Sequence, residues 1–214
     1  RPGEPTGFNP LQLPDSAANR AFLTDWTARL MSPVGEVLPA DDLERIREAV
    51  DANYDQQPAY RRLRYFAELF RGDKRPHALD IAARLRPWWG KGENAWLFDN
   101  ATDELDLDVR TIGFDMTQVL DDPSLRTPAM MYLFHRVQER LDGSPSLIVI
   151  DEGWKALDDD AFVNRIKDWE KTIRKRNGLV GFATQSASDA LESRIASAII
   201  EQAATQIFFP NNRA

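Results

Sequence analysis

Two adjacent carboxylates, Asp151 and Glu152, directly follow a run of four apolar residues at 147–150. A continuous apolar run predicts a strand that is buried on both faces, which is typical of a parallel sheet. Acidic residues at the carboxyl end of such a strand lie where open α/β sheets bind their ligands. The pattern therefore predicts the Walker B strand of a P-loop NTPase. An ordinary buried strand that ends in a solvated Asp-Glu turn has the same pattern.

The sequence contains no Walker A loop to match this strand. The glycine-containing segments 3–7 and 90–92 both lack the Gly-Lys-Ser/Thr signature. The Lys of that signature is the group that reaches the phosphates of the nucleotide. The chain begins abruptly at Arg1, and we expect it to be a piece of a larger domain.

Composition is that of an ordinary globular protein, with 43% hydrophobic and 29% charged residues among 214. The formal net charge of −7 gives no support for nucleic acid as a partner of the whole surface. Cysteine is absent, which excludes disulfides and Cys-ligated zinc. The only histidines, His77 and His135, are far apart in sequence, and no apolar run is long enough to span a membrane.

Residues 16–86 have the apolar periodicity of helices. The spacing predicts a first helix through Phe22, Trp26 and Leu30 after a Ser16 or Asn19 cap, and a second that begins at Asp41–Asp42. A third is expected over 60–70 and a shorter fourth over 77–85. Trp88–Trp89 are expected to pack the helices against a sheet; the alternative is a platform on which bases stack.

The second half of the chain is expected to alternate strands and helices. The sequence predicts a hairpin over 95–108, a strand over 111–119, and a helix in which Thr127 is the N-cap and Pro128 the first residue. Further strands are expected at 179–184 and 205–209. A helix over 159–176 should carry Arg174 and Arg176 in its last turn, where the helix dipole by itself favours basic residues.

Six segments, in this order along the chain, carry a resemblance to a known family. They are GEPTGFNPLQL (3–13), WLFDN (96–100), IGFDMTQVLDD (112–122), IVIDEGWKALDD (148–159), RKRNGLVGFATQSASDAL (174–191) and IIEQAATQIFFPN (199–211). Together they resemble the CagE/TrbE/VirB ATPases of bacterial type IV secretion and conjugation systems, which belong to the HerA/FtsK-like class of P-loop motors. The resemblance covers nearly the whole chain.

The resemblance implies an α/β fold, a RecA-like parallel sheet core with an inserted all-helical subdomain. On this basis residues 1–15 are a loop from the ATPase core, 16–90 the all-helical subdomain, and 91–214 the part of the core that carries Walker B. In the family, Walker A precedes the GEPTGFNPLQL-like segment. The chain is therefore expected to be a C-terminal fragment with an incomplete core, inactive by itself.

The resemblance also assigns roles to individual residues. Asp151 is expected to hold Mg²⁺ through water, and Glu152 to activate the attacking water. Gln185, after the strand next to Walker B, resembles the polar residue that senses the γ-phosphate, and residues at this position of a sheet face the ligand. Arg174 resembles an arginine finger, with Arg176 as the competing candidate; a finger stabilises charge on the transferring phosphoryl group.

The expected cofactors are ATP and Mg²⁺. A finger offered to a neighbour's nucleotide implies a homo-oligomeric ring, most simply a hexamer, at the cytoplasmic face of the bacterial inner membrane. The expected partners are the secretion channel and its coupling components. Two other functions remain open: a docking or assembly module without turnover, and a DNA-translocating motor, which rests on analogy within the class.

Overall fold

The computed structural model describes residues 3–32, 36–71, 80–151, 172–184, 203 and 205–210. Its contacts divide the chain into two compact units, residues 1–140 and 141–214. The first unit is helical in its described part, and the second contains a parallel pair of strands. The predicted division into segments 1–15, 16–90 and 91–214 stays a prediction. A division of the chain by its contacts does not identify which segments belong to the ATPase core.

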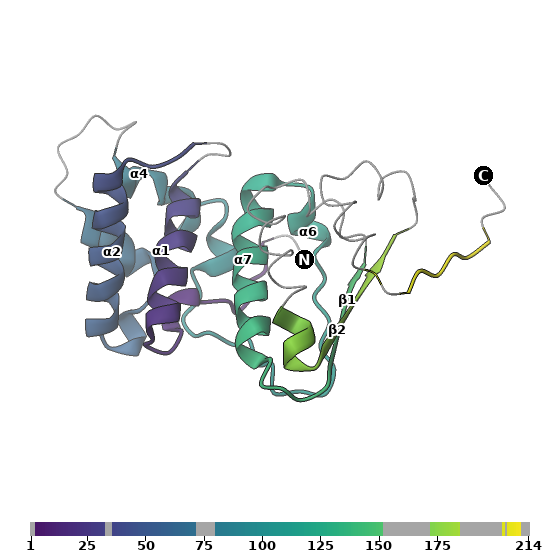
Figure 1. Ribbon diagram of the computed structural model, residues 1–214. Helices are drawn as coiled ribbons and strands as arrows, with labels where there is room; N and C mark the ends of the chain where they lie inside the picture. The colour runs from purple at the N-terminus through teal and green to yellow at the C-terminus, as the bar shows by residue number, and fades with distance from the viewer. Residues whose placement is uncertain are drawn as a thin grey trace. The chain divides into compact units, whose positions relative to one another are not determined.

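The first unit is built from three longer helices and several single turns (Figure 1). Its α-helices are α1 (Ala17–Met31), α2 (Ala40–Asp55), α3 (Leu63–Phe66), α4 (Ile81–Arg84), α5 (Ala95–Phe98), α6 (Thr117–Leu120) and α7 (Pro123–Arg140). Its 3₁₀ turns are η1 (Pro10–Gln12), η2 (Pro58–Tyr60), η3 (Ala67–Phe70) and η5 (Arg86–Trp88). Helix α1 packs against both α2 and α7, so the three long helices lie side by side.

Helix α1 confirms its prediction from sequence. Ser16 is the N-cap, and its side chain accepts a hydrogen bond from the backbone N–H of Asn19 at 3.1 Å. The predicted stripe of Phe22, Trp26 and Leu30 is buried. Trp26 is fully buried, meets Phe98 edge to face at 5.0 Å, and donates its indole N–H to the carbonyl of Pro128 on α7.

Helix α2 is also confirmed, whereas the third predicted helix is broken. Residues 58–70 form η2, α3 and η3 in place of one continuous helix. Leu63, Phe66 and Phe70 are nevertheless buried in the same core. Burial therefore follows the predicted pattern even though the backbone is divided into short turns. Trp88 belongs to this core too, and its indole N–H donates to the carbonyl of Leu30 at 3.0 Å.

The predicted start of α7 at Thr127–Pro128 is wrong. The helix begins at Pro123, and Pro128 lies inside it. Asp122 accepts hydrogen bonds from the backbone N–H and the hydroxyl of Ser124, so Asp122–Pro123 is the real cap and first position. Both Thr-Pro and Asp-Pro carry the same start signal, and tertiary packing selects the earlier one.

Two further predictions are wrong in the described residues. Segment 95–108 contains the helical turn α5 and no strand, and 111–119 contains no strand before α6. The described residues 205–210 are likewise without strand pairing. A short apolar run does not distinguish a strand from a helical turn, and a strand needs a partner to pair with.

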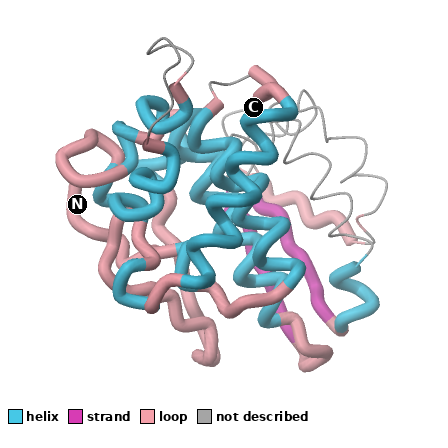
Figure 2. The backbone as a smooth tube through the Cα atoms, turned by 90° about the vertical axis from the view of Figure 1, so that its left-hand side faces the viewer, coloured by secondary structure: helices cyan, strands magenta, loops and turns pink. Residues whose placement is uncertain are grey.

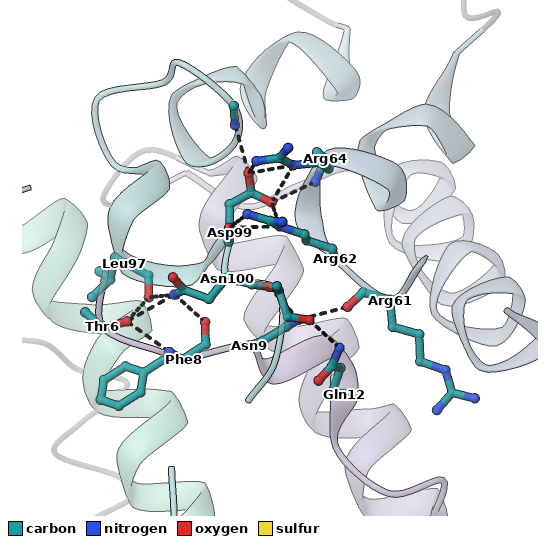
Figure 3. A network of polar contacts seen from close by, with 12 residues as sticks. Thr6, Phe8, Asn9, Gln12, Arg61, Arg62, Arg64, Leu97, Asp99 and Asn100 are labelled. Carbon is teal, nitrogen blue, oxygen red and sulfur yellow. Dashed lines mark hydrogen bonds and ion pairs between the residues drawn. The ribbon is translucent and has the colours of Figure 1, made fainter. Parts of the chain in front are cut away.

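A buried carboxylate, Asp99, accepts hydrogen bonds from two segments of the helical unit, the start of α3 and the turn after η5 (Figure 3). Its side chain is only 1% exposed. It accepts from the guanidinium groups of Arg62 at 3.1 Å and Arg64 at 2.9 Å, and from the backbone N–H of Gly90 at 2.9 Å. Arg62 also donates to the carbonyl of Asp99. A buried charge requires such pairing, because desolvation of an unpaired carboxylate is very costly.

Next to Asp99, two asparagines join segments that are about 90 residues apart in sequence (Figure 3). Asn100 donates from its amide to the carbonyl of Phe8 at 2.9 Å. Asn9 donates to the carbonyls of Asn100 and Arg61, both at 2.9 Å. Thr6 closes the group through its hydroxyl, which donates to the carbonyl of Leu97. Segments 6–12 and 97–103 are thus fixed to each other.

The second unit contains β1 (Ser146–Asp151) and β2 (Gly178–Ala183). The 3₁₀ turn η7 (Arg174–Arg176) directly precedes β2. The strands pair in parallel, with Ser146 opposite Gly178 and Asp151 opposite Ala183 (Figure 2). Both predicted strands and their parallel arrangement are confirmed. The predicted helix over 159–176 lies outside the described residues except for its end.

The prediction that β1 is buried on both faces is wrong for this chain. Leu147 and Val149 are 66% and 64% exposed, and their neighbour Leu179 on β2 is 66% exposed. The opposite face, with Ile148 and Ile150, is only half-buried. Parallel strands are buried by the elements that pack over their two faces, so their sequence alone does not bury them.

Replacing Asp99 with Asn should destabilise the helical unit by about 3 kcal/mol, because two arginines would lose their buried counter-charge. The free energy of unfolding, measured by urea denaturation, tests this. Asp55→Asn, at the exposed end of α2, is the matched control and should change it by less than about 0.5 kcal/mol. Equal midpoints for the two variants would contradict the central role of Asp99.

Candidate functional site

Asp151 is the last residue of β1 and lies at the carboxyl edge of the strand pair. The parallel register brings it opposite Ala183, so both strands end at this edge. Asp151 is exposed, and its carboxylate is accessible to a ligand. This is the edge at which open α/β sheets bind their ligands, as the sequence predicts.

Glu152 and Gln185 lie outside the described residues. Their places in the sequence are nevertheless informative, since Glu152 directly follows Asp151 and Gln185 comes two residues after Ala183. Both residues therefore follow strand ends that the register places at one edge. The structure does not describe their side chains, and the roles of Glu152 and Gln185 stay predictions.

The structure places the two candidate arginines at the opposite end of the strands. Arg174 and Arg176 belong to η7, which leads into the amino end of β2 at Gly178. Six strand residues separate that end from the Asp151 edge, a distance of about 17 Å at roughly 3.3 Å per residue. The backbone of Arg174 is thus remote from the carboxylate of Asp151 in the same chain, while its side chain is outside the description.

Arg176 differs from Arg174 in having a described structural contact. Its guanidinium donates to the carbonyl of Leu141 at 3.2 Å. This hydrogen bond ties η7 to the segment before β1, and it satisfies a carbonyl at the end of that segment. Arg176 therefore has a structural role within the second unit.

A tight turn fixes η7 relative to the two strands. Asn177 has a positive φ of 59°, and its carbonyl accepts a hydrogen bond from the backbone N–H of Ser146 at 3.2 Å. A Cβ atom at Gly178 would lie 2.7 Å from a methyl carbon of Ile173, which is buried. Only glycine allows this close approach. The chain therefore turns at Asn177–Gly178 from η7 into β2.

The residues at the edge fit a magnesium ion that keeps its water. Mg²⁺ is usually held by one or two carboxylates together with substrate phosphates, and it retains several waters. A single exposed carboxylate at Asp151 suits this mode. Among the described residues, no group of three or more His, Cys, Asp or Glu side chains could enclose a metal. None of the described helices is long and apolar enough to cross a membrane.

Sequence analysis missed the Asp99 centre, which lies within the segment WLFDN. Its partners Arg62 and Arg64 are more than 30 residues away in sequence, and no local sequence pattern predicts an ion pair over such a separation. The available signal was an acidic residue directly after an apolar turn, together with the cluster Arg61, Arg62 and Arg64 that follows Pro58 earlier in the chain.

Comparison with known proteins identifies the class. The TraG P-loop domain matches residues 42–213, most of the chain. Together with the parallel strands and the carboxylate at their edge, this match shows that the chain belongs to the TraG P-loop domain family.

The relatives of this chain are components of type IV secretion systems. It is 44% identical over 213 residues to the type IV secretion system protein virB4 of Bartonella henselae, covering 99% of this chain and 27% of the relative. It is 38% identical over 223 residues to virB4 of Brucella abortus and 37% identical over 221 residues to PtlC of Bordetella pertussis, covering 100% of this chain and 27% of each relative. The chain spans about a quarter of the length of these relatives.

A solved structure supports the same fold. The structure of VirB4 of Thermoanaerobacter pseudethanolicus superposes with a TM-score of 0.64 at 16% sequence identity. The superposition covers 89% of this chain and 57% of the other. The fold of this chain is therefore similar to part of the fold of that VirB4.

Replacing Gly178 with Ala should lower stability by about 1–3 kcal/mol, because the added methyl overlaps Ile173 and forces the turn to move. Gly181→Ala is a matched control on the same strand, since a Cβ there meets no atom within 4 Å. Chemical denaturation of both variants measures the difference. A loss for Gly181→Ala as large as that for Gly178→Ala would disprove this account of the turn.

Proposed function

We propose that this chain is part of the ATPase domain of a type IV secretion or conjugal transfer ATPase, which couples ATP hydrolysis to channel assembly or substrate transfer. The observation that carries this proposal is Asp151 at the carboxyl edge of two parallel strands in a chain of the TraG P-loop family. A RecA-like core completed by the rest of the protein is part of the same proposal.

In this proposal each residue has one task. Asp151 orients the water shell of a bound Mg²⁺, and the ion supplies positive charge to the phosphate oxygens. Glu152 accepts a proton from the attacking water, as a general base does. Gln185 donates a hydrogen bond to the γ-phosphate from the end of the neighbouring strand. The 214 residues contain no Gly-Lys-Ser/Thr loop, so we assign nucleotide binding and turnover to the longer protein and expect inactivity of the chain alone.

Arg174 is proposed as an arginine finger that acts on the nucleotide of a neighbouring subunit. The separation of about 17 Å between the two strand ends supports this, since it leaves Arg174 on the side opposite its own Asp151. Arg suits the role because its planar guanidinium stays charged and bridges phosphate oxygens. A finger in trans implies a ring, and a hexamer is proposed.

The proposed site of action is the secretion machinery, with the protein peripheral to the cytoplasmic face of the inner membrane. Relatives that are named type IV secretion system proteins support the secretion machinery, and the membrane face is proposed from the family resemblance. Channel and coupling components are the proposed partners. The net charge of −7 favours a protein partner over nucleic acid.

In the intact protein, Glu152→Gln should lower ATP turnover by about two decades or more while ATP affinity stays within a few-fold. The amide keeps the shape of the side chain and loses its basicity. Steady-state ATPase assays and calorimetry measure the two quantities, and Glu48→Gln on the exposed face of α2 is the matched control. Near-normal turnover in Glu152→Gln would remove Glu152 from the mechanism.

Arg174→Ala should lower turnover strongly while ATP binding to the monomer and the unfolding midpoint stay unchanged. Mixing this variant with Glu152→Gln should restore part of the activity, because some interfaces then pair an intact Glu152 with an intact Arg174. The same experiment with Arg176→Ala should show a stability loss without recovery on mixing, since Arg176 binds the carbonyl of Leu141. Absence of recovery with Arg174→Ala in rings that exchange subunits would refute a finger in trans.

A further inference from the structure

The helical unit contains a cleft of about 720 Å³ that the proposed ATPase function does not use. It is lined by residues of η3, α4, η5 and the turn that follows η5. Three basic side chains, Arg71, Arg86 and Lys91, contribute to its wall, together with Trp89. We refer to it as the Lys91 cleft.

The turn that carries Lys91 is held rigidly. The buried carboxylate of Asp99 accepts the backbone N–H of Gly90 at 2.9 Å. Beyond Lys91, the N–H of Gly92 donates to the carbonyl of Trp89 at 2.9 Å. A Cβ atom at Gly92 would lie 2.3 Å from the carbonyl oxygen of Arg86, so only glycine fits there. The backbone around Lys91 is thus preorganised, which reduces the entropy lost when a ligand binds.

The acidic groups of the Lys91 cleft are already engaged within the fold. Glu68 forms an ion pair with Arg71 at 2.5 Å. Asp80 is the N-cap of α4 and accepts the backbone N–H of Ala82 at 2.9 Å. Glu68 and Asp80 therefore interact with groups other than Arg86 and Lys91.

The remaining polar side chains among the described residues that line the cleft are hydrogen-bond donors. Arg86 and Lys91 are exposed and form no ion pair with any residue that the structure describes. The indole N–H of Trp89 is buried, and within the described ranges it has no hydrogen-bond partner. The Trp89 N–H is enclosed, so Arg86 and Lys91 are the donors that a ligand can reach, and they form charge-assisted hydrogen bonds with a ligand that brings carboxylate oxygens.

We propose that the Lys91 cleft binds an acidic peptide segment of a partner protein, with carboxylates paired to Arg86 and Lys91. A short peptide fits better than a nucleic acid, because two cations can pair with two carboxylates, whereas a surface of net charge −7 does not match the continuous charge of a polynucleotide. A carboxylate needs only the local positive potential of the two free cations. This proposal is independent of the ATPase assignment.

The test measures fluorescence anisotropy of labelled hexaglutamate with the intact protein at low salt. Arg86→Gln combined with Lys91→Gln should weaken binding by about tenfold or more, since charge-assisted hydrogen bonds are lost. Arg110→Gln, an exposed arginine that does not line the cleft, is the matched control and should change affinity less than about twofold. Hexaglutamine should not bind.

Unchanged affinity in the Arg86–Lys91 double variant would overturn the proposal. So would an oligothymidylate that binds more tightly than hexaglutamate and depends on the same two residues, since that result identifies a nucleic-acid site.

Discussion

The helical unit depends on one buried negative charge. Asp99 is surrounded by two guanidinium groups and a backbone N–H, and these come from α3 with its preceding residue and from the turn after η5. Isolated helical turns of three or four residues are unstable in water, because nucleation costs more than a single turn returns. The elements α3 and η5 therefore exist by virtue of tertiary contacts. The core buries their apolar side chains, and Asp99 fixes where their backbones lie.

The parallel register of β1 and β2 imposes a second constraint, on chemistry. Because paired parallel strands end at the same edge, Asp151 and Ala183 lie opposite each other there, and the chain continues from that edge after both strands. In the same register, η7 lies at the amino end of β2, the edge opposite Asp151. The carboxylate of Asp151 and the backbone of η7 therefore lie at opposite ends of the strand pair.

Local signals in the sequence were sufficient for some elements and failed for others. Ser16 with its apolar stripe predicted α1, and the apolar runs at 147–150 and 179–183 predicted β1 and β2. The start of α7 was wrong because Asp122–Pro123 and Thr127–Pro128 carry the same signal. Exposure of Leu147 and Val149 depends on what packs over the strand, which its own residues do not encode. The Asp99 centre was missed for a similar reason, since its partners are distant in sequence.

Apolar and polar groups have different roles in the helical unit where segments 6–12 and 97–103 meet. Leu11, Trp26 and Phe98 supply burial, which is insensitive to small shifts of the backbone. The amides of Asn9 and Asn100 each donate to named carbonyls about 90 residues away, and such bonds weaken steeply when atoms move. Apolar substitutes of similar volume would preserve much of the stability and lose this positional restraint. The polar centre therefore determines how segments 6–12 and 97–103 lie relative to each other within the helical unit.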